Sequence, residues 1–337
     1  MLVLLACHTV TEVVTSAPDS GVDSAAELDS GGETGDSSQD SAVDSGVDDT
    51  GDTADTGTSV VEWPEAGPAC TSWGEPAQTG TVVDVALEEI SGLVASFQNP
   101  GVLWVLEDHG NPADIVALDV AGNTLATLTL EVDENVDWEE LILAPCGDSA
   151  CLVVVDAGDN SGEREELAFL VVEEPVLDGV TTALSAVPDA YHFRYPEAPE
   201  NCEAAAVAPD GRFFLYTKRP DNTAGVYVVP AYQDGVVAEV LGDIPTGPED
   251  DPGPQNAATG ASFWPDGSRL LLRTYTGSLE FSLPDGVDKL DAVTFTPLPT
   301  PPIDHIETIT YDVVNRGYWT IPEAPEGAPI FWVPCLD

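Results

Sequence analysis

The sequence predicts an all-β fold, a β-propeller, and three observations support this prediction. One phrase recurs along the chain: a short apolar run, a turn and a second apolar run, clearest at residues 202–219 with Asp210-Gly211 as the hairpin turn. The copies begin about 50 to 60 residues apart, a spacing of the size that propeller blades have. No window has a sustained helical period, and 30 Gly and 28 Pro residues separate the short runs.

Five copies of the phrase can be identified, each anchored on the residue that opens its first apolar run. The anchors are 48 to 64 residues apart: Glu89, Glu139, Glu203, Thr259 and Glu307. Two further apolar runs follow each of the first four copies, so we expect four strands in a blade. The last copy lacks an outer strand, which residues 79–85 can supply, closing the ring without an open edge. Five blades are predicted, and six are the alternative, because the longest step could hide a degenerate unit.

The first residues resemble the end of a bacterial lipoprotein signal. Leu4-Leu5-Ala6-Cys7 matches the lipobox, where the chain is cleaved and the cysteine is lipidated. The alternative is an apolar start that arose by chance. Under the lipoprotein interpretation residues 1–7 are the signal remnant, and the protein is extracytoplasmic and lipid-anchored to the bacterial cell envelope. His8 after the cysteine, in place of Asp, favours the outer membrane.

An acidic linker is predicted over residues 8–61. It consists mainly of Asp, Ser, Thr, Gly and Ala and contains no aromatic residue. Such a segment buries too little apolar surface to offset its chain entropy, so we expect it to be disordered and extended by its own charge. A tether that holds residues 62–337, the propeller domain, away from a membrane is the favoured interpretation. A row of weak calcium ligands is the alternative.

The charge of the chain excludes two classes of partner. There are 61 acidic and 9 basic residues, and the formal net charge is −52. Such a field repels nucleic acid and anionic lipid surfaces, so contact with a membrane is expected through the lipid anchor alone. It favours solubility, a monomer and the binding of divalent cations.

The cysteines of the propeller domain predict two disulfides. Cys146 and Cys151 flank the tip of one hairpin, a spacing that suits a small loop disulfide. Cys70 and Cys335 bracket the domain, and closure of the ring would bring them together. Cys202 then remains unpaired, and an inert buried thiol is favoured over a catalytic one.

Equivalent positions of the repeats meet around one axis, because the innermost strand of every blade lines the central channel. The anchors should therefore form a ring of carboxylates that Thr259 interrupts, and charged residues at the ends of the following strands should form a second tier. Lys218 and Arg273 are the bases placed to neutralise these acids. The alternative to a binding site is a structural lattice that joins the blades. The predicted channel ring consists of Glu89, Glu139, Glu203, Glu307, Lys218, Arg273 and Asp108.

Two acidic loops near this ring suggest a metal. They carry hard oxygen ligands next to a Gly that permits a tight turn, as calcium sites prefer, although neither follows the complete EF-hand pattern. Solvated turns are the alternative. The candidate ligands are Asp137, Asp156, Asp159 and Asn160, and calcium is the cofactor that they would favour.

Several of these phrases resemble a family of bacterial extracytoplasmic β-propeller lipoproteins, loosely similar to phytase-like and esterase-like propellers. They include EISGLVAS, NVDWEELILAP, VVDAGDNSGER and ENCEAAAVAPDGRFFLYTKR, and the resemblance covers most of residues 87–323. It implies a propeller at the cell envelope. The chain departs from the family where Glu107-Asp108-His109-Gly110 stands in place of the more usual Asn-Asp-Ser-Gly.

Two functions remain open at this stage. The first is a module that binds a small ligand or a protein partner on a face of the propeller, with calcium. The second is a calcium-dependent hydrolase of phosphoesters or other esters at the central channel, with Lys218 and Arg273 receiving an anion. The chain has no Gly-x-Ser-x-Gly elbow, no His-Glu-x-x-His motif and no phosphate-binding glycine loop, so no motif decides whether it is an enzyme.

Overall fold

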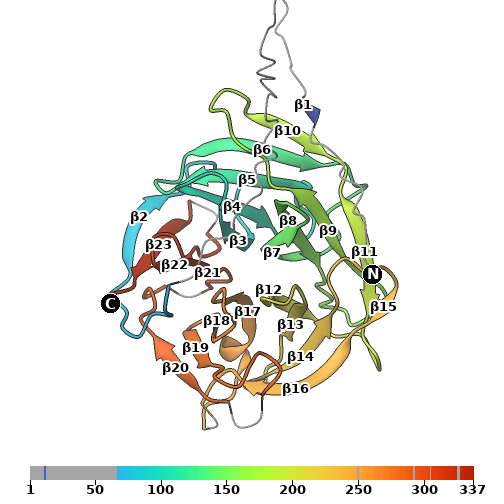
Figure 1. The fold of residues 1–337 in the computed structure, drawn as a ribbon, viewed down its shortest axis with the longest axis vertical. Helices are drawn as coiled ribbons and strands as arrows, with labels where there is room; N and C mark the ends of the chain where they lie inside the picture. The colour runs from blue at the N-terminus through green and yellow to red at the C-terminus, as the bar shows by residue number, and fades with distance from the viewer. Residues whose placement is uncertain (1–10, 13–66, 249, 291–292, 304, 325–326) are drawn as a thin grey trace, which may run out of the picture. The chain divides into compact units, whose positions relative to one another are not determined.

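A computed structural model describes residues 11–12 and 67–337, except 249, 291–292, 304 and 325–326. The described residues form five β-sheets around a central axis, so the predicted five-bladed propeller is confirmed (Figure 1). Helical structure within the described part is limited to one 3-10 turn at Pro254–Asn256.

The first blade has four strands of its own and two additions at its outer edge. From the axis outward its strands are β3 (Ile90–Ala95), β4 (Val102–Glu107), β5 (Asp114–Asp119) and β6 (Thr124–Leu130). The additions are β10 (Ala183–Ala186), parallel to β6, and β1 (Thr11–Glu12), antiparallel to β10. The connection from the second blade therefore returns across the first and covers its edge, which protects that edge from pairing with another chain.

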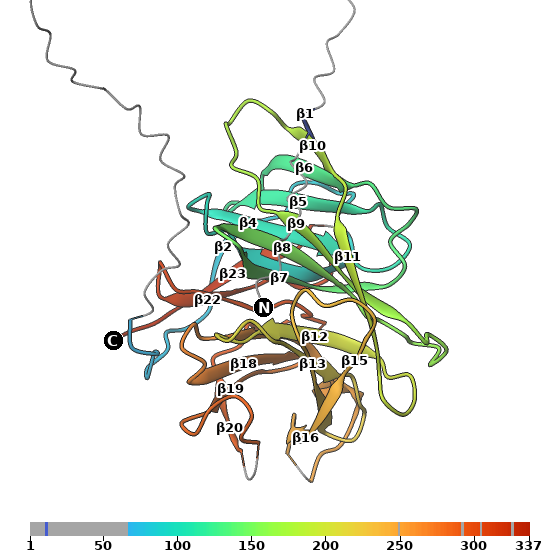
Figure 2. The same cartoon turned by 45° about the vertical axis from the view of Figure 1, so that its right-hand side comes forward.

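The next three blades repeat this order from the axis outward and are antiparallel, except for the parallel outermost strand of the second, and Figure 2 shows them in a view turned by 45°. The second contains β7 (Trp138–Cys146), β8 (Ser149–Asp156), β9 (Leu167–Glu173), β11 (Asp189–Arg194) and β15 (Val236–Val237). The third contains β12 (Cys202–Val207), β13 (Phe213–Thr217), β14 (Thr223–Val229) and β16 (Glu239–Pro245). The fourth contains β17 (Ala258–Phe263), β18 (Arg269–Thr274), β19 (Ser278–Ser282) and β20 (Phe295–Leu298).

The fifth blade is completed from the other end of the chain, as predicted. Its strands are β21 (Thr310–Asp312), β22 (Gly317–Thr320), β23 (Pro329–Pro334) and the outer strand β2 (Ala77–Thr81). β2 pairs antiparallel with β23, and Ala77 lies opposite Trp332. The ring is therefore closed by hydrogen bonds between the two ends of the domain.

Both predicted disulfides are confirmed. Cys70 and Cys335 are joined beside the closing strands, with their Cα atoms 5.7 Å apart, and Cys146 and Cys151 are joined at the tip of the β7–β8 hairpin. Cys202 is a buried free thiol, and burial raises its pKa to about 12. A thiol with so high a pKa is not ionised near neutral pH, as expected for an inert core cysteine.

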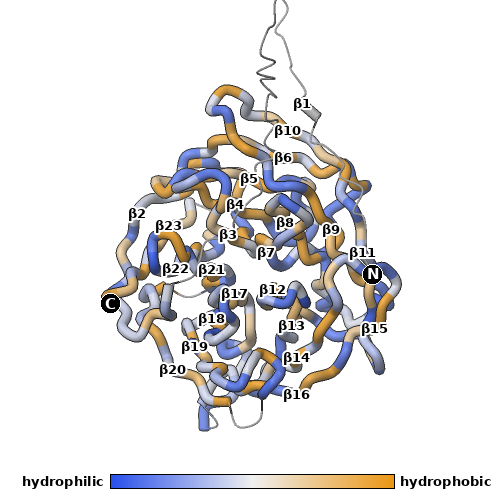
Figure 3. The backbone as a smooth tube through the Cα atoms, viewed as in Figure 1, coloured by the Kyte–Doolittle hydropathy of each residue, from blue (hydrophilic) through white to orange (hydrophobic). Residues whose placement is uncertain are grey.

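The core lies between neighbouring blades. Each inner blade face packs against the next sheet, so Trp104 of the first blade and Trp138 of the second share one apolar cluster. Strands buried on both faces have nearly continuous apolar sequences, and Figure 3 shows this as orange stretches along β8 and β9. This packing fixes the inner strands, and with them the side chains that line the channel.

The lipobox with Cys7 and the boundaries of the linker at residues 8–61 lie outside the described residues, apart from Thr11–Glu12. Among the residues that are described, no helix is both long and apolar enough to cross a membrane.

Candidate functional site

Four of the five inner strands begin with the same irregularity, a β-bulge that leaves one residue without a partner on the next strand. In the first four blades the register shifts across a single residue. In the fifth blade Glu307 takes this place, between the bridge at Ile306 and the hydrogen-bonded Thr308. A bulge re-aims its side chain, here towards the channel. The bulge ring is Ser91, Glu139, Glu203, Thr259 and Glu307.

The predicted place of Glu89 in this ring is wrong by two residues. Ser91 is the unpaired residue of β3, and Glu89 corresponds instead to Asp137, two positions before the bulge of the second blade. Glu89 is exposed, and Asn111 Nδ2 donates a hydrogen bond to its Oε2 over 3.0 Å. The prediction aligned the repeat copies on their acidic residues, whereas the bulge shows which residues are structurally equivalent.

A second ring follows from the same registers. In each blade the residue just before the member of the bulge ring pairs with one residue at or just beyond the end of the second strand. These partner residues lie at one level around the axis: Glu107, Asp156, Thr217, Thr274 and Pro322. The residue that follows each of them lies at the channel mouth. The mouth ring is therefore Asp108, Ala157, Lys218, Tyr275 and Glu323. Asp108 and Lys218 were predicted here, while Tyr275 was not.

Arg273 does not supply a counter-charge to this ring, contrary to the prediction. It pairs with Gly260, two residues before Tyr275, at a level that Leu106 and Val155 occupy in the first two blades. Its guanidinium is fully buried and donates to Ser278 Oγ over 2.9 Å and to the Ile306 carbonyl over 3.3 Å. Among the described residues no carboxylate forms an ion pair with it, and burial lowers its pKa to about 9. Arg273 is a core residue.

Glu139 is a deeply buried acid of the site. It is 3% exposed, and its Oε1 atom is buried without a hydrogen-bond donor among the described residues. Burial raises its pKa well above the usual range, and the neighbouring carboxylates of Glu203, Asp108, Asp137 and Glu307 raise it further. A buried oxygen without a donor, among other acids, is the kind of group that a cation or a proton satisfies.

Gly158 shows how tightly two of these carboxylates are held. A Cβ at this position would lie 2.3 Å from Glu139 Oε1 and 2.5 Å from Asp137 Oδ2. No side chain fits at such distances. The absence of a Cβ at Gly158 therefore allows the carboxylates of Glu139 and Asp137 to lie against the same stretch of backbone.

Glu203 has the counter-charge that the sequence predicted. The Lys218 ammonium donates to Glu203 Oε1, and Asn201 Nδ2 donates to the same oxygen over 3.0 Å. Lys218 Nζ also lies 5.2 Å from the centroid of the Tyr275 ring. Burial raises the pKa of Glu203 and Lys218 opposes this rise, while Glu203 raises the pKa of Lys218 against the effect of burial. This part of the mouth is an internal ion pair.

Glu307 and Glu323 form a carboxyl pair at the opposite side of the mouth. Burial, followed by the charges of Glu323 and Glu203, raises the pKa of Glu307 to about 8. Burial also raises the pKa of Glu323, and the neighbouring Glu307 side chain opposes this rise.

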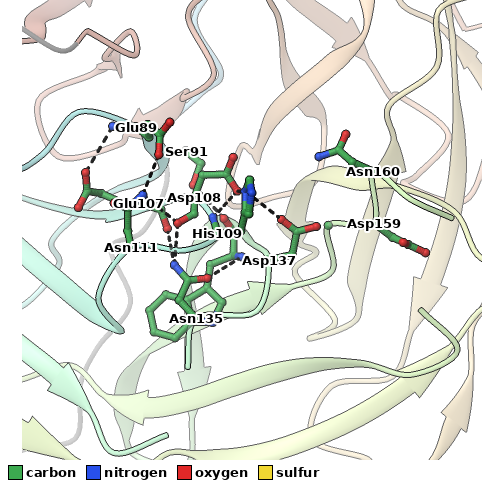
Figure 4. Close-up of polar contacts among 12 residues, drawn as sticks. Glu89, Ser91, Glu107, Asp108, His109, Asn111, Asn135, Asp137, Asp159 and Asn160 are labelled. Carbon is green, nitrogen blue, oxygen red and sulfur yellow. Dashed lines mark hydrogen bonds and ion pairs between the residues drawn. The ribbon is translucent and has the colours of Figure 1, made fainter. Parts of the chain in front are cut away.

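The third part of the mouth joins Asp108, His109 and Asp137 (Figure 4). His109 Nδ1 lies 3.2 Å from Asp108 Oδ1 and 3.7 Å from Asp137 Oδ1, and one ligand atom from each residue lies within 4.8 Å of the others. Asn135 braces the loop, because its Nδ2 donates to the carbonyls of Glu107 and Asp108 over 2.9 and 2.8 Å. Burial and then Asp108 raise the pKa of Asp137 to about 6. These three residues fit a metal ion.

The other predicted metal ligands have protein partners. Asp156 forms a 2.8 Å ion pair with Arg164, and Asp159 accepts the backbone N–H groups of Glu163 and Arg164 over 3.0 and 2.8 Å. Asn160 Oδ1 accepts Asn201 Nδ2 over 3.1 Å. Of the four predicted ligands, Asp137 alone joins the carboxylates of the mouth.

Comparison with solved structures finds similar chains of low sequence identity. An aldose sugar dehydrogenase from Streptomyces coelicolor, solved in its PQQ-bound form, is 11% identical, with a TM-score of 0.47, covering 80% of this chain and 99% of its own. A luciferin-regenerating enzyme is 10% identical, with a TM-score of 0.46 and coverage of 79% and 96%. An auxiliary nutrient binding protein from Bacteroides thetaiotaomicron is 10% identical, with a TM-score of 0.40 and coverage of 78% and 77%.

No protein-family model matches the chain, and no curated protein matches it. Proteins of one propeller fold carry many unrelated activities, so the function of this chain has to be argued from its own channel mouth.

Proposed function

We propose that this protein is a binding module whose channel mouth holds a divalent cation, with calcium as the first candidate. The observation that carries the proposal is Glu139 Oε1, a buried carboxylate oxygen that lacks a hydrogen-bond donor and lies beside Asp137 at Gly158. Calcium takes six to eight oxygen ligands, and acids held together by the fold supply them.

The balance of charge at the mouth supports a cation. Lys218 is engaged by Glu203, and Arg273 lies in the core, so neither neutralises Glu139 and Asp137. Uncompensated buried charges cost several kcal/mol each, and without a cation these acids would have to hold protons. A bound divalent cation would replace them. Asp108 and Asp137, which lie together with His109, and Glu139, which lies beside Asp137 at Gly158, are the residues that would supply its oxygen ligands.

A groove next to the ion pair gives room for the ligand of such a module. It encloses about 290 Å³ and is lined by the polar Asn160, Asn201, Lys218 and Arg219, with Pro220, Pro254 and Ala257 as apolar walls. Because Lys218 belongs to both the groove and the mouth, a small ligand in this groove would reach the cation. A loop of a protein partner is the other occupant that fits the proposal, and the module itself would act as a monomer.

We place this module outside the cytoplasm, lipid-anchored at Cys7 to the cell envelope and lifted from it by the acidic linker. Two disulfides favour an oxidising compartment, and so does the lipobox. Incorporation of labelled palmitate into the full chain, and its loss in Cys7→Ser, tests this part of the proposal.

A calcium-dependent hydrolase of phosphoesters or other esters is the second candidate. The Lys218 ammonium and the Tyr275 ring lie beside the carboxylates, an arrangement that would receive an anionic group. The predicted second base, Arg273, is absent from the mouth, which weakens this candidate relative to binding alone. A screen with generic phosphatase and esterase substrates in calcium distinguishes the two.

The binding proposal is tested by thermal unfolding in a calcium titration. Calcium should raise the melting temperature of the wild type, and Glu139→Gln should abolish this rise while changing the apo melt little. Glu280→Gln is the matched control, since Glu280 is a largely buried acid of the fourth blade that accepts the Tyr311 hydroxyl over 2.9 Å. A wild-type melt that millimolar calcium leaves unchanged would reject the proposal.

A further inference from the structure

Glu140, next to Glu139, carries a carboxylate that no part of the proposed cation site uses. It is 1% exposed. Its Oε1 accepts the backbone N–H of Leu141 and its Oε2 accepts that of Ala261, both over 3.0 Å. The backbone N–H groups of Leu93 and Ala205 also face it, and burial raises the pKa of this carboxyl while all four N–H groups lower it.

These four donors come from four different blades. Each is the second residue after the bulged residue of its inner strand, so the four N–H groups lie at one level around the channel. A side chain that reaches all four strands must lie at the propeller axis. The carboxylate of Glu140 therefore stands in the centre of a ring of backbone amides.

The equivalent positions in the other blades leave room for it. They are occupied by Gly92, Ala204, Gly260 and Thr308. At Gly260 a Cβ would lie 2.6 Å from the Glu307 carbonyl oxygen, and at Gly92 it would lie 2.7 Å from the Leu141 nitrogen. One long side chain among four small ones fills the axis, and a second would not fit.

Convergent backbone N–H groups form an anion-binding site. The described partners of the Glu140 carboxylate are all donors, and these N–H groups favour its ionised form against burial, which raises the pKa of the group. A buried charge is tolerated when all its hydrogen-bonding positions are filled in this way.

We infer that the inner strands build an anion site at the propeller axis, and that Glu140 occupies it as an internal ligand. Once this side chain is removed, the site takes a small free carboxylate such as formate or acetate. The carboxylate joins four blades through their innermost strands, at the place where the sheets come closest.

An apolar cavity begins next to the amide ring. On the side away from the carboxylate mouth, the strand segments that follow the amide ring line a cavity of about 150 Å³, mainly apolar, with Leu93, Leu141, Ala205 and Ala261 at its near end. Glu140 therefore separates the acidic mouth from this cavity.

Chemical rescue of Glu140→Ala tests the inference. The variant should melt below the wild type, and acetate or formate should raise its melting temperature saturably by about 5 °C, because a ligand bound only by the folded state stabilises it. The wild type in the same acetate series is the control for salt effects. Acetamide, which has the shape of acetate without its charge, should give no rescue.

An equal acetate effect on the variant and the wild type, or rescue by acetamide as well, would overturn the inference. Should Glu140→Ala fail to fold, Glu140→Gln serves instead. Its amide turns N–H groups towards N–H donors, so it should melt below the wild type, and a wild-type melt for this variant would contradict an anion site. Calcium plays no part in these experiments, so their outcome is separate from that of the proposed cation site.

Discussion

At the scale of single residues, the mouth combines three ways of keeping acids together. Glu203 has a base, Glu307 lies beside Glu323 and has a raised pKa, and Glu139 Oε1 lacks a hydrogen-bond donor among the described residues. Three environments therefore surround one aperture. Their differences predict which substitutions affect stability and which affect cation binding.

Glu307 gives the apo protein a pH-dependent stability. Its pKa is raised to about 8, above the ordinary value near 4.5, so the folded state binds a proton that the unfolded state releases between these values. The stabilisation is complete below about pH 4.5 and is lost as the pH rises towards 8. Melts of the apo protein between pH 5 and 8 should therefore fall by an amount equivalent to a few kcal/mol, and Glu307→Gln should flatten this fall. An unchanged slope in the variant would contradict the assignment.

Lys218 is expected to stabilise the mouth chiefly by compensating Glu203. Lys218→Met leaves the buried Glu203 carboxylate without its base, and we expect a loss of about 2–3 kcal/mol, since Lys218 is partly exposed. The double variant Lys218→Met with Glu203→Gln should recover much of this loss. Urea unfolding of the four proteins measures the coupling. Additive effects would show that the ion pair does not act as a unit.

At the scale of elements, the bulge at the start of four of the five inner strands is what organises the site. It directs one residue per blade to the channel. After the bulge, the pairing of the inner strand with the second strand is shifted by one residue. The sequence pattern is an apolar residue, the bulged residue and, in most copies, a small one, as in Ile90-Ser91-Gly92 and Ala258-Thr259-Gly260. Matching copies on this pattern, and not on acids, would have placed Ser91 in the ring and Tyr275 at the mouth.

Gly158 is predicted to be required by the site and not by the backbone. In Gly158→Ala the added methyl group meets Glu139 and Asp137 at distances that force the two carboxylates apart. We expect calcium affinity to fall by about tenfold or more, which corresponds to about 1.4 kcal/mol or more, with a smaller effect on apo stability. Isothermal titration measures this, and Gly147→Ala at an open hairpin tip is a control for glycine substitution, with its positive φ expected to cost stability alone. Unchanged affinity in Gly158→Ala would show that the cation does not use these two acids.

At the scale of the whole molecule, the sequence predicted the fold better than the site. Blade number, closure by residues near Thr79 and both disulfides followed from repeat spacing and from the need to pair the last edge. The repeat spacing can be recognised even when the copies are aligned one or two residues out of register. The same error assigns the wrong residue to the channel. Arg273 and Glu89 were misplaced for this reason, and the role of Glu140 depends on backbone donors from other blades that no local pattern reveals.

The closing disulfide should matter more than the hairpin disulfide. Cys70 and Cys335 are 265 residues apart, and Cys146 and Cys151 are 5 apart. In the chain-entropy model the first is worth about 5 kcal/mol and the second about 2 kcal/mol. Paired Cys→Ser variants compared by urea unfolding should show this order, and equal losses would mean that closure of the ring does not rely on the covalent bond.

The most direct test of the central claim, a cation site at the channel mouth, is a crystal structure of the propeller domain grown in millimolar calcium. The account predicts one ion at the mouth, with carboxylate oxygens of Glu139 and Asp137 at about 2.3–2.6 Å from it. The site should be empty in crystals of Glu139→Gln grown in the same way. An ion bound only at the loop of Asp156 and Asp159, or a mouth in which Glu139 remains without an ion at that concentration, would contradict the claim.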